Sequence, residues 1–194
     1  MSIRGLFEAV ADAFDGPREI EQAAQSALRI GAKSAAYNGT GSPLPADFIR
    51  VMSGADAHPV CQSILATPLD WAPPTTSDDP AYVAHSHPKV HVELLGPGGI
   101  VRSDKIRIGL YGILPNAEYG IRTHPAEEIF VMLAGNADWK HGNDPYTTLG
   151  PGQRSFHPSM MPHATRTTNS AFMSAYVWNG DISTENYVYQ GIPS

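Results

Sequence analysis

The stretch from Tyr119 to Gly135 reads YGIRTHPAEEIFVMLAG and joins a polar cluster to a long apolar run. Its polar half holds His124 and Glu128, four residues apart, and a further histidine, His163, follows a Gly/Pro-rich run downstream. Two histidines and a carboxylate are a common ligand set for Zn²⁺ and for non-haem Fe²⁺. The stretch therefore predicts a metal pocket in a β-rich body.

Short segments of alternating or continuous apolar character surround this stretch. They cover residues 90–94, 106–110, 128–134, 137–141, 172–178 and 187–189. The run 128–134 is apolar almost throughout, as in a strand that is buried on both faces. Short strands separated by Gly/Pro turns, such as the turn at Gly96–Gly99, are typical of a sandwich or barrel. We therefore expect β structure throughout the chain after residue 80.

The first part of the chain has a helical pattern instead. Residues 3–14 place apolar side chains on one helical face, and Gly16-Pro17 ends that helix. Residues rich in Ala, Gln and Glu predict a second helix over 17–37, and shorter helices are expected at 47–52 and 60–65. The Pro-rich stretch 71–80 is expected to be a linker. We expect a helical segment, 1–70, packed on a barrel, 71–194, within a single structural domain.

Composition narrows the function class. The formal net charge of −6 argues against a nucleic-acid-binding protein, because binding to phosphates needs a basic surface. A single cysteine, Cys61, excludes an internal disulfide framework and fits a reducing compartment, where we expect a buried thiol. No apolar run approaches the roughly 18 residues of a membrane span, and the N-terminus does not resemble a signal peptide. We expect a cytoplasmic monomer or homodimer that binds a small molecule and neither nucleic acid nor membrane.

The spacing of the polar residues matches a known pattern. It is written His124-x3-Glu128-x6-Gly135 and, further on, Gly152-x5-Pro158-x4-His163. This resembles the two motifs of the cupin superfamily, whose fold is a double-stranded β-barrel (jelly roll) with a metal near its centre. The resemblance implies a mainly β cupin fold with an N-terminal helical cap. In the superfamily pattern another histidine lies two residues before the one matched by His124, and here that position holds Arg122.

A narrower resemblance is to the cupin-type dimethylsulfoniopropionate (DMSP) lyases of the Q type, which split DMSP into dimethyl sulfide and acrylate. It rests on the N-terminal helical cap and on Leu95–Gly99, Tyr119–Gly135, Pro-His163-Ala and Trp178. The first motif of that family runs Tyr-x2-His-x-His-x3-Glu-x-Tyr. This chain reads Tyr119-x2-Arg122-x-His124-x3-Glu128-x-Phe130.

The resemblance implies a metal-dependent carbon–sulfur lyase. Its metal ligands would be His124, Glu128 and His163, holding one divalent ion (Zn²⁺, Fe²⁺ or Mn²⁺), and Tyr119 would match a tyrosine proposed as the catalytic base. The chain departs from the family at Phe130, which replaces a tyrosine that can ligate the metal or act as base. A phenyl ring can do neither.

The side chains expected to contact the substrate follow from its charges. A dimethylsulfonium cation favours aromatic faces, for which Trp178, Phe130, Tyr119 and Tyr111 are candidates. Arg122 is natural near a carboxylate, and its presence leaves open a different acid as substrate.

Other readings use the same residues. A set of two histidines and one carboxylate also suits a cupin dioxygenase or isomerase acting on a small carboxylic acid, and a non-catalytic cupin would keep the pocket for ligand binding. The segment His85-Ser-His87-Pro-Lys-Val-His91 imitates a metal motif, but we expect it to line the barrel mouth or a subunit contact. His141 and His157 are further polar pocket candidates.

Overall fold

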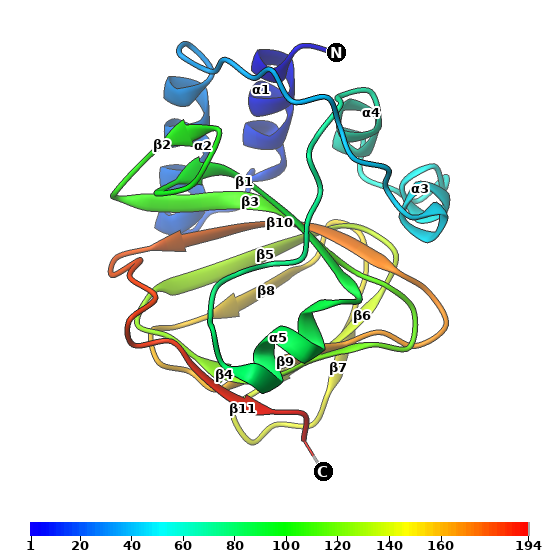
Figure 1. The fold of residues 1–194 in the computed structure, drawn as a ribbon, viewed down its shortest axis with the longest axis vertical. Coiled ribbons are helices and arrows are strands. Elements are labelled where there is room, and N and C mark those ends of the chain that lie inside the picture. The colour runs from blue at the N-terminus through cyan, green and yellow to red at the C-terminus, as the bar shows by residue number, and fades with distance from the viewer. Residues whose placement is uncertain (194) are drawn as a thin grey trace.

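The strands form two sheets in the computed structural model, which describes residues 1–193 (Figure 1). One sheet has the order β2-β1-β3-β10-β5-β8 and the other has the order β11-β4-β9-β6-β7. The bounds are β1 Lys89–Gly96, β2 Val101–Arg102, β3 Ile106–Ile113, β4 Glu118–Thr123, β5 Glu127–Ala134, β6 Ala137–His141, β7 Thr147–Leu149, β8 Arg154–His157, β9 His163–Arg166, β10 Phe172–Asn179 and β11 Val188–Gly191.

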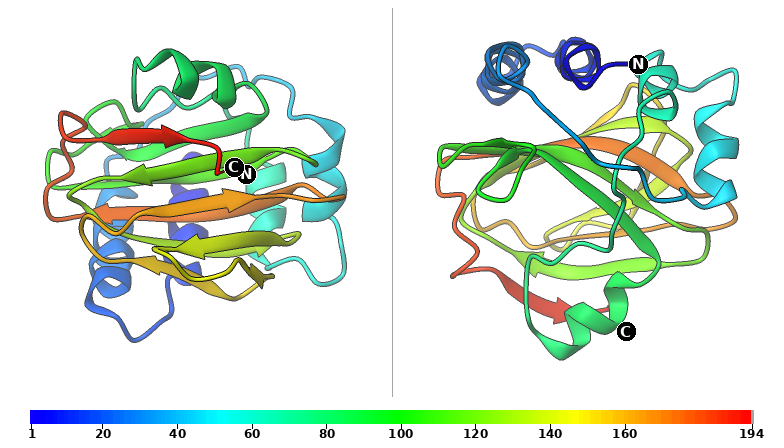
Figure 2. Two further views of the ribbon diagram at one scale, coloured as in Figure 1. Left: turned by 90° about the horizontal axis from the view of Figure 1, so that it is seen from below. Right: turned by 45° about the horizontal axis from the view of Figure 1, so that its top comes forward.

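Four helices pack on the outer face of the six-stranded sheet, as Figures 1 and 2 show from three directions. Their bounds are α1 Ile3–Ala13, α2 Glu19–Gly31, α3 Ala46–Met52 and α4 Val60–Leu65. The Ser2 hydroxyl accepts a hydrogen bond from the Gly5 amide and caps α1. Helix α2 ends at Gly31, short of residue 37, so the predicted length of that helix was wrong.

The position of strand β5 between two cores explains why its sequence is apolar almost throughout. Ile129, Val131 and Leu133 belong to the core shared with the helices. Phe130 and Met132 belong to a second, largely aromatic core built by residues of both sheets. Side chains alternate along a strand, so β5 buries one face against the helices and the other between the sheets. Glu128 therefore shares the inner face with Phe130.

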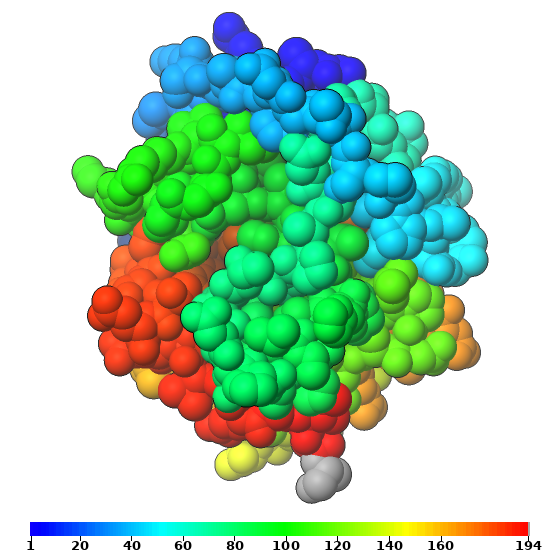
Figure 3. All heavy atoms as spheres, viewed as in Figure 1, coloured from blue at the N-terminus to red at the C-terminus, as the bar shows by residue number. Residues whose placement is uncertain are grey.

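A helix interrupts the region that was expected to be entirely β. Helix α5, Pro80–Ser86, begins with Pro80 in its first turn, and the Asp79 carboxylate accepts from the amides of Ala81 and Tyr82. Proline fits the first helical turn because its missing N–H has no partner to lose there. The expectation of β structure from residue 80 was therefore wrong for this segment, which crosses the front of the molecule in Figure 3.

The layers confirm a mainly β cupin fold with helices over one sheet. The division of the chain at residue 70 stays a prediction. None of the helices described in residues 1–193 has the length and hydropathy of a membrane span.

Candidate metal centre and active-site cavity

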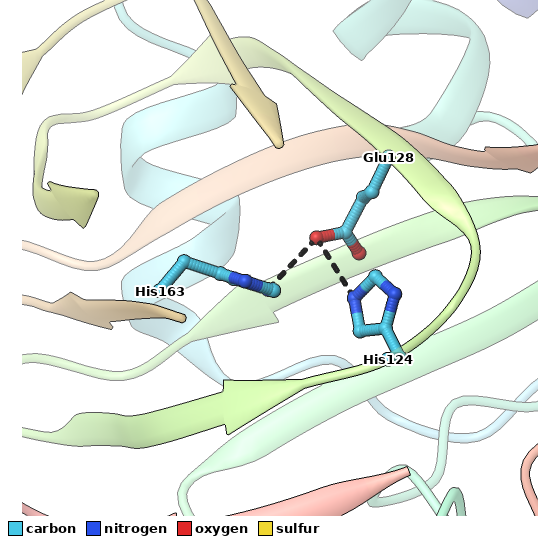
Figure 4. A group of neighbouring side chains, drawn as sticks. All are labelled: His124, Glu128 and His163. Carbon is cyan, nitrogen blue, oxygen red and sulfur yellow. Dashed lines mark ion pairs between the residues drawn. The ribbon is translucent and has the colours of Figure 1, made fainter. Parts of the chain in front are cut away.

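His124, Glu128 and His163 point toward one another in the interior of the molecule (Figure 4). His124 follows the end of β4, Glu128 lies in β5, and His163 begins β9. Glu128 Oε2 is 3.1 Å from His163 Nε2 and 3.5 Å from His124 Nε2. Ligand atoms from the three buried residues all lie within 4.8 Å of one another. The group can therefore hold a metal ion.

The hydrogen bonds of the two histidines fix which nitrogen faces the carboxylate. His124 Nδ1 is 3.0 Å from the Ala126 carbonyl, and His163 Nδ1 is 2.8 Å from the Met161 carbonyl. A carbonyl only accepts, so each Nδ1 carries a hydrogen and donates it, which leaves each Nε2 to face the carboxylate. Neither Nε2 has a hydrogen-bond partner among the described residues.

This arrangement suits a cation. Two nitrogen lone pairs and a carboxylate oxygen face one another in a buried space, where unpaired polar atoms are costly. Burial raises the pKa of Glu128, but the neighbouring imidazoles of His124, His157 and His163 hold that pKa well below its usual range. Burial, aided by His157 and Arg122, lowers the pKa of His163 well below its usual value. Ionised glutamate and neutral histidine are the forms that bind a divalent metal.

Both oxygens of Glu128 also accept hydrogen bonds from residues outside the group. His157 Nδ1 lies 2.7 Å from Oε2, and Trp178 Nε1 donates to Oε1 over 2.5 Å. The sequence indicated His157 only as a polar pocket candidate and Trp178 only as a possible substrate contact. The structure places both directly on the carboxylate.

A cavity of about 170 Å³ opens beside Glu128. Much of its wall is aromatic, and the rings come from Tyr111, Tyr119, Phe130, Tyr176 and Trp178. The remaining wall is supplied by Pro74, Thr75, Thr76, His91, Glu93, Arg107 and Thr184. The structure thus brings the aromatic residues that the sequence singled out to one small cavity with Glu128 on its wall.

Tyr119 stands among aromatic and cationic neighbours. Its hydroxyl is 2.6 Å from the hydroxyl of Tyr187, and its ring lies under two cations, with Arg122 Cζ 3.8 Å and Lys89 Nζ 4.3 Å from the ring centroid. Burial, with smaller effects from Tyr187 and Tyr82, raises the pKa of Tyr119 well above its usual value, and Arg122 opposes that rise. Tyr119 is therefore protonated at neutral pH in this state.

Arg122 lies next to the cavity without lining it. It sits opposite His163 in the β4–β9 pair, and its side chain is buried. Nη1 donates to the Tyr119 carbonyl over 3.4 Å, whereas Nη2 has no hydrogen-bond partner within residues 1–193. A buried guanidinium with an unused N–H is a ready partner for an anion.

The segment from His85 to His91, which imitates a metal motif in the sequence, does not form a metal-binding cluster. His85 Nδ1 is 2.8 Å from the Tyr189 hydroxyl, and His91 Nε2 is 2.8 Å from the Tyr176 hydroxyl. Within the described part of the chain, the one cluster with metal-binding spacing is that of Figure 4. His91 does line the cavity.

Sequence reasoning missed Tyr176, Tyr187 and Arg107. Tyr176 lies two residues before Trp178 in β10, so strand alternation places both on the cavity side, and this signal was available. The bond between Tyr187 and Tyr119 joins residues 68 apart and depends on how β11 returns to β4. No local pattern encodes it.

Comparison with known proteins gives a consistent result. The family model described as DMSP lyase matches residues 58–174. The chain is 42% identical over 91 residues to dimethylsulfoniopropionate lyase DddQ of Ruegeria pomeroyi, and the aligned region spans 47% of this chain and 45% of that protein.

Two solved structures resemble the chain over nearly its full length. The crystal structure of DMSP lyase DddQ from Ruegeria pomeroyi DSS-3 gives a TM-score of 0.65 at 25% identity, covering 96% of each chain. A structure from a study of the DMSP lyases RdDddP and RnDddQII gives a TM-score of 0.66 at 20% identity, covering 97% of this chain and 100% of the other. At 20% identity, this second similarity is evidence for a shared fold alone.

Proposed function

Because the chain belongs to the dimethylsulfoniopropionate lyase family, we propose that it cleaves DMSP into dimethyl sulfide and acrylate by base-catalysed β-elimination. Membership follows from the family match over residues 58–174, which is more than half of the chain. The observation that carries the proposal is the group of His124, Glu128 and His163, whose carboxylate lies on the wall of an aromatic cavity.

We assign the three residues of this group as the protein ligands of one divalent ion, Zn²⁺, Fe²⁺ or Mn²⁺. When bound, the ion would act as a Lewis acid that stabilises negative charge developing on the substrate carboxylate. The bare Nε2 atoms of His124 and His163 and the ionised Glu128 support the assignment. Nitrogen and oxygen ligands of this kind accept all three metals, so availability selects among them.

The cavity wall offers separate partners to the two charged ends of DMSP. The dimethylsulfonium cation would lie against the rings of Trp178 and Phe130, where cation–π attraction favours it. The Tyr111 hydroxyl is buried and has no protein partner among the described residues, so it is free to donate to the substrate carboxylate. The Arg122 guanidinium, which has an unused N–H, provides positive charge next to the Tyr119 ring.

Tyr119 is assigned as the general base. Its phenolate would take the proton from the carbon beside the substrate carboxylate, and that C–H electron pair would form the C=C bond of acrylate. The C–S bond breaks as the C=C bond forms, and its electron pair leaves with dimethyl sulfide. Arg122, whose guanidinium lies over the Tyr119 ring, favours the phenolate by charge. Tyr187 accepts or donates at the same oxygen and holds it in place.

The proposal is tested by measuring dimethyl sulfide in the headspace over enzyme and DMSP, with Zn²⁺, Fe²⁺ and Mn²⁺ supplied in turn. We expect release with at least one metal, the same yield under nitrogen as under air, and loss of release after chelation. Product that forms only in air would exclude the lyase and favour a cupin dioxygenase. No product with any metal, in either atmosphere, would leave DMSP without support as substrate.

The pH dependence of kcat/KM should follow the ionisation of the Tyr119 hydroxyl. Its pKa is raised by burial, so the protonated, inactive form dominates at neutral pH and the phenolate grows as pH rises. We expect kcat/KM to increase about tenfold per pH unit between roughly pH 7 and pH 9. Initial rates of dimethyl sulfide release across this range would measure it. A profile that stays flat there would contradict Tyr119 as the base.

We further propose a cytoplasmic enzyme that acts on its small-molecule substrate as a monomer or homodimer, without nucleic acid. The net charge of −6 supports the last point. The single cysteine, Cys61, is buried, and burial raises its pKa to about 12, as expected for an unreactive reduced thiol.

A further inference from the structure

We propose that His157 is a positioning residue that locks Glu128 into presenting a single oxygen, Oε2, to the space between His124 and His163. The inference rests on the proposed metal site and names a residue outside its ligand set. His157 is fully buried on β8 and faces Glu128 across the β5–β8 pair, where the two residues are direct neighbours in register.

A continuous chain of hydrogen bonds determines which ring nitrogen of His157 carries the hydrogen. His141 Nε2 is 2.9 Å from Ser155 Oγ, Ser155 Oγ is 2.9 Å from His157 Nε2, and His157 Nδ1 is 2.7 Å from Glu128 Oε2. An ionised carboxylate only accepts, so His157 Nδ1 carries the hydrogen. His157 Nε2 must then accept from the Ser155 hydroxyl, whose oxygen accepts in turn from His141. Each link has one allowed direction, and all of them point toward Glu128.

The two oxygens of Glu128 are thereby made unequal. Oε1 accepts from Trp178 Nε1 on one side. Oε2 accepts from His157 and faces the bare Nε2 atoms of His163 and His124 at 3.1 Å and 3.5 Å. A carboxylate held at both oxygens cannot rotate to offer Oε1 to the same space without breaking both bonds. His157 and Trp178 together therefore select Oε2 as the ligand atom.

The packing of His157 in the fold holds its hydrogen bond to Glu128 in place. The His157 ring also stacks on His163, with centroids 4.0 Å apart and planes 12° apart. His141 is the register partner of His163 in the β6–β9 pair. The chain from His141 to Glu128 thus starts and ends beside the ligand group and links both sheets. Residues that hold metal ligands by hydrogen bonds commonly change metal affinity about 10- to 100-fold when they are altered.

A matched pair of substitutions separates the hydrogen bond from the bulk of the ring. In His157→Asn the amide nitrogen falls near the place of Nδ1 and can still donate to Glu128. In His157→Gln it falls near the place of Nε2 and loses that donation. We would load each variant of this chain with Co²⁺, measure the dissociation constant by competition with a coloured chelator, and record the visible Co²⁺ spectrum. His58, which lies outside the cavity lining, supplies the control His58→Gln.

We expect His157→Gln to weaken Co²⁺ binding about 10- to 100-fold and to alter the spectrum, with His157→Asn staying within a few-fold of wild type. Equal affinities and spectra in the two variants, whether both weak or both strong, would overturn the inference. Thermal melting of the apo proteins identifies a variant that fails to fold. In that event Ser155→Ala, which removes the donor to His157 Nε2, must still change the spectrum, and an unchanged one would also overturn it. Wild type that binds no Co²⁺ would instead refute the proposed metal site.

Discussion

Replacing Glu128 with glutamine is expected to lower dimethyl sulfide release by on the order of 10³-fold or more, because it removes the only anionic ligand of the proposed site. The substitution keeps the size and shape of the side chain, so its amide oxygen can still accept from Trp178 Nε1. An amide nitrogen in the place of Oε2 can donate to the bare Nε2 of His163 or His124, although it no longer accepts from His157 Nδ1. The metal-free variant should therefore still fold.

Two measurements make this prediction specific. Metal analysis should find the bound divalent ion in wild type and little in Glu128→Gln, and thermal melting should show that the apo variant still unfolds cooperatively. Full metal content and full activity in Glu128→Gln would contradict the ligand assignment. A variant that is inactive because it is unfolded would be recognised by its melting curve, and His163→Ala then provides the second test of the same site.

Replacing Tyr119 with phenylalanine is expected to reduce kcat by about 10²- to 10⁴-fold with little change in KM, as for the loss of a general base. The ring and its contacts with Arg122 and Lys89 are kept, and only the hydroxyl is removed. The remaining activity should also lose its rise with pH, because the group that titrates is gone. Steady-state rates of dimethyl sulfide release at several pH values would show both effects.

Tyr187→Phe is the matched control for this substitution. It breaks the same hydrogen bond, 2.6 Å long between the two hydroxyls, but leaves the phenol of Tyr119 in place. The expected loss of kcat is therefore much smaller than in Tyr119→Phe. A larger loss in Tyr187→Phe would show that Tyr187 is the base and Tyr119 its hydrogen-bond partner.

The arrangement of strands was largely predictable because the local pattern and the tertiary packing agree. The run of β5 is buried on both sides, so its apolar sequence is a direct result of its place between the helices and the inner core. Helix α5 was missed because the Pro-rich stretch before it suggested a linker. Asp79 followed by Pro80 is a recognisable helix start, and this local signal was overlooked.

The candidate site was predictable in part for a similar reason. His124 and Glu128 are close in sequence, and the motif that includes His163 has a recognisable spacing, so the three could be grouped before the fold was known. His157 and Tyr187 could not be given roles in this way. Their contacts depend on strand register, which pairs His157 with Glu128, and on the return of the chain at β11. A pattern read along the chain contains neither.

The two departures from the family motif have physical consequences in the structure. Phe130 lies on the cavity wall and adds an aromatic face without a hydroxyl, while Tyr111, whose ring is 5.9 Å away, brings a hydroxyl with no protein partner among residues 1–193. Arg122, at a position where the family motif has a histidine, puts a permanent charge over the Tyr119 ring. Neither change removes a residue of the group in Figure 4.

The most direct test of a metal-dependent elimination is to follow the conversion of DMSP by proton NMR, under nitrogen, with enzyme that has been stripped by chelator and then reloaded with one divalent metal. We expect dimethyl sulfide and acrylate to appear in equal amounts as DMSP disappears, and stripped enzyme to produce neither. Unchanged DMSP with every metal, or equal conversion by the stripped and reloaded enzyme, would contradict a metal-dependent elimination at His124, Glu128 and His163.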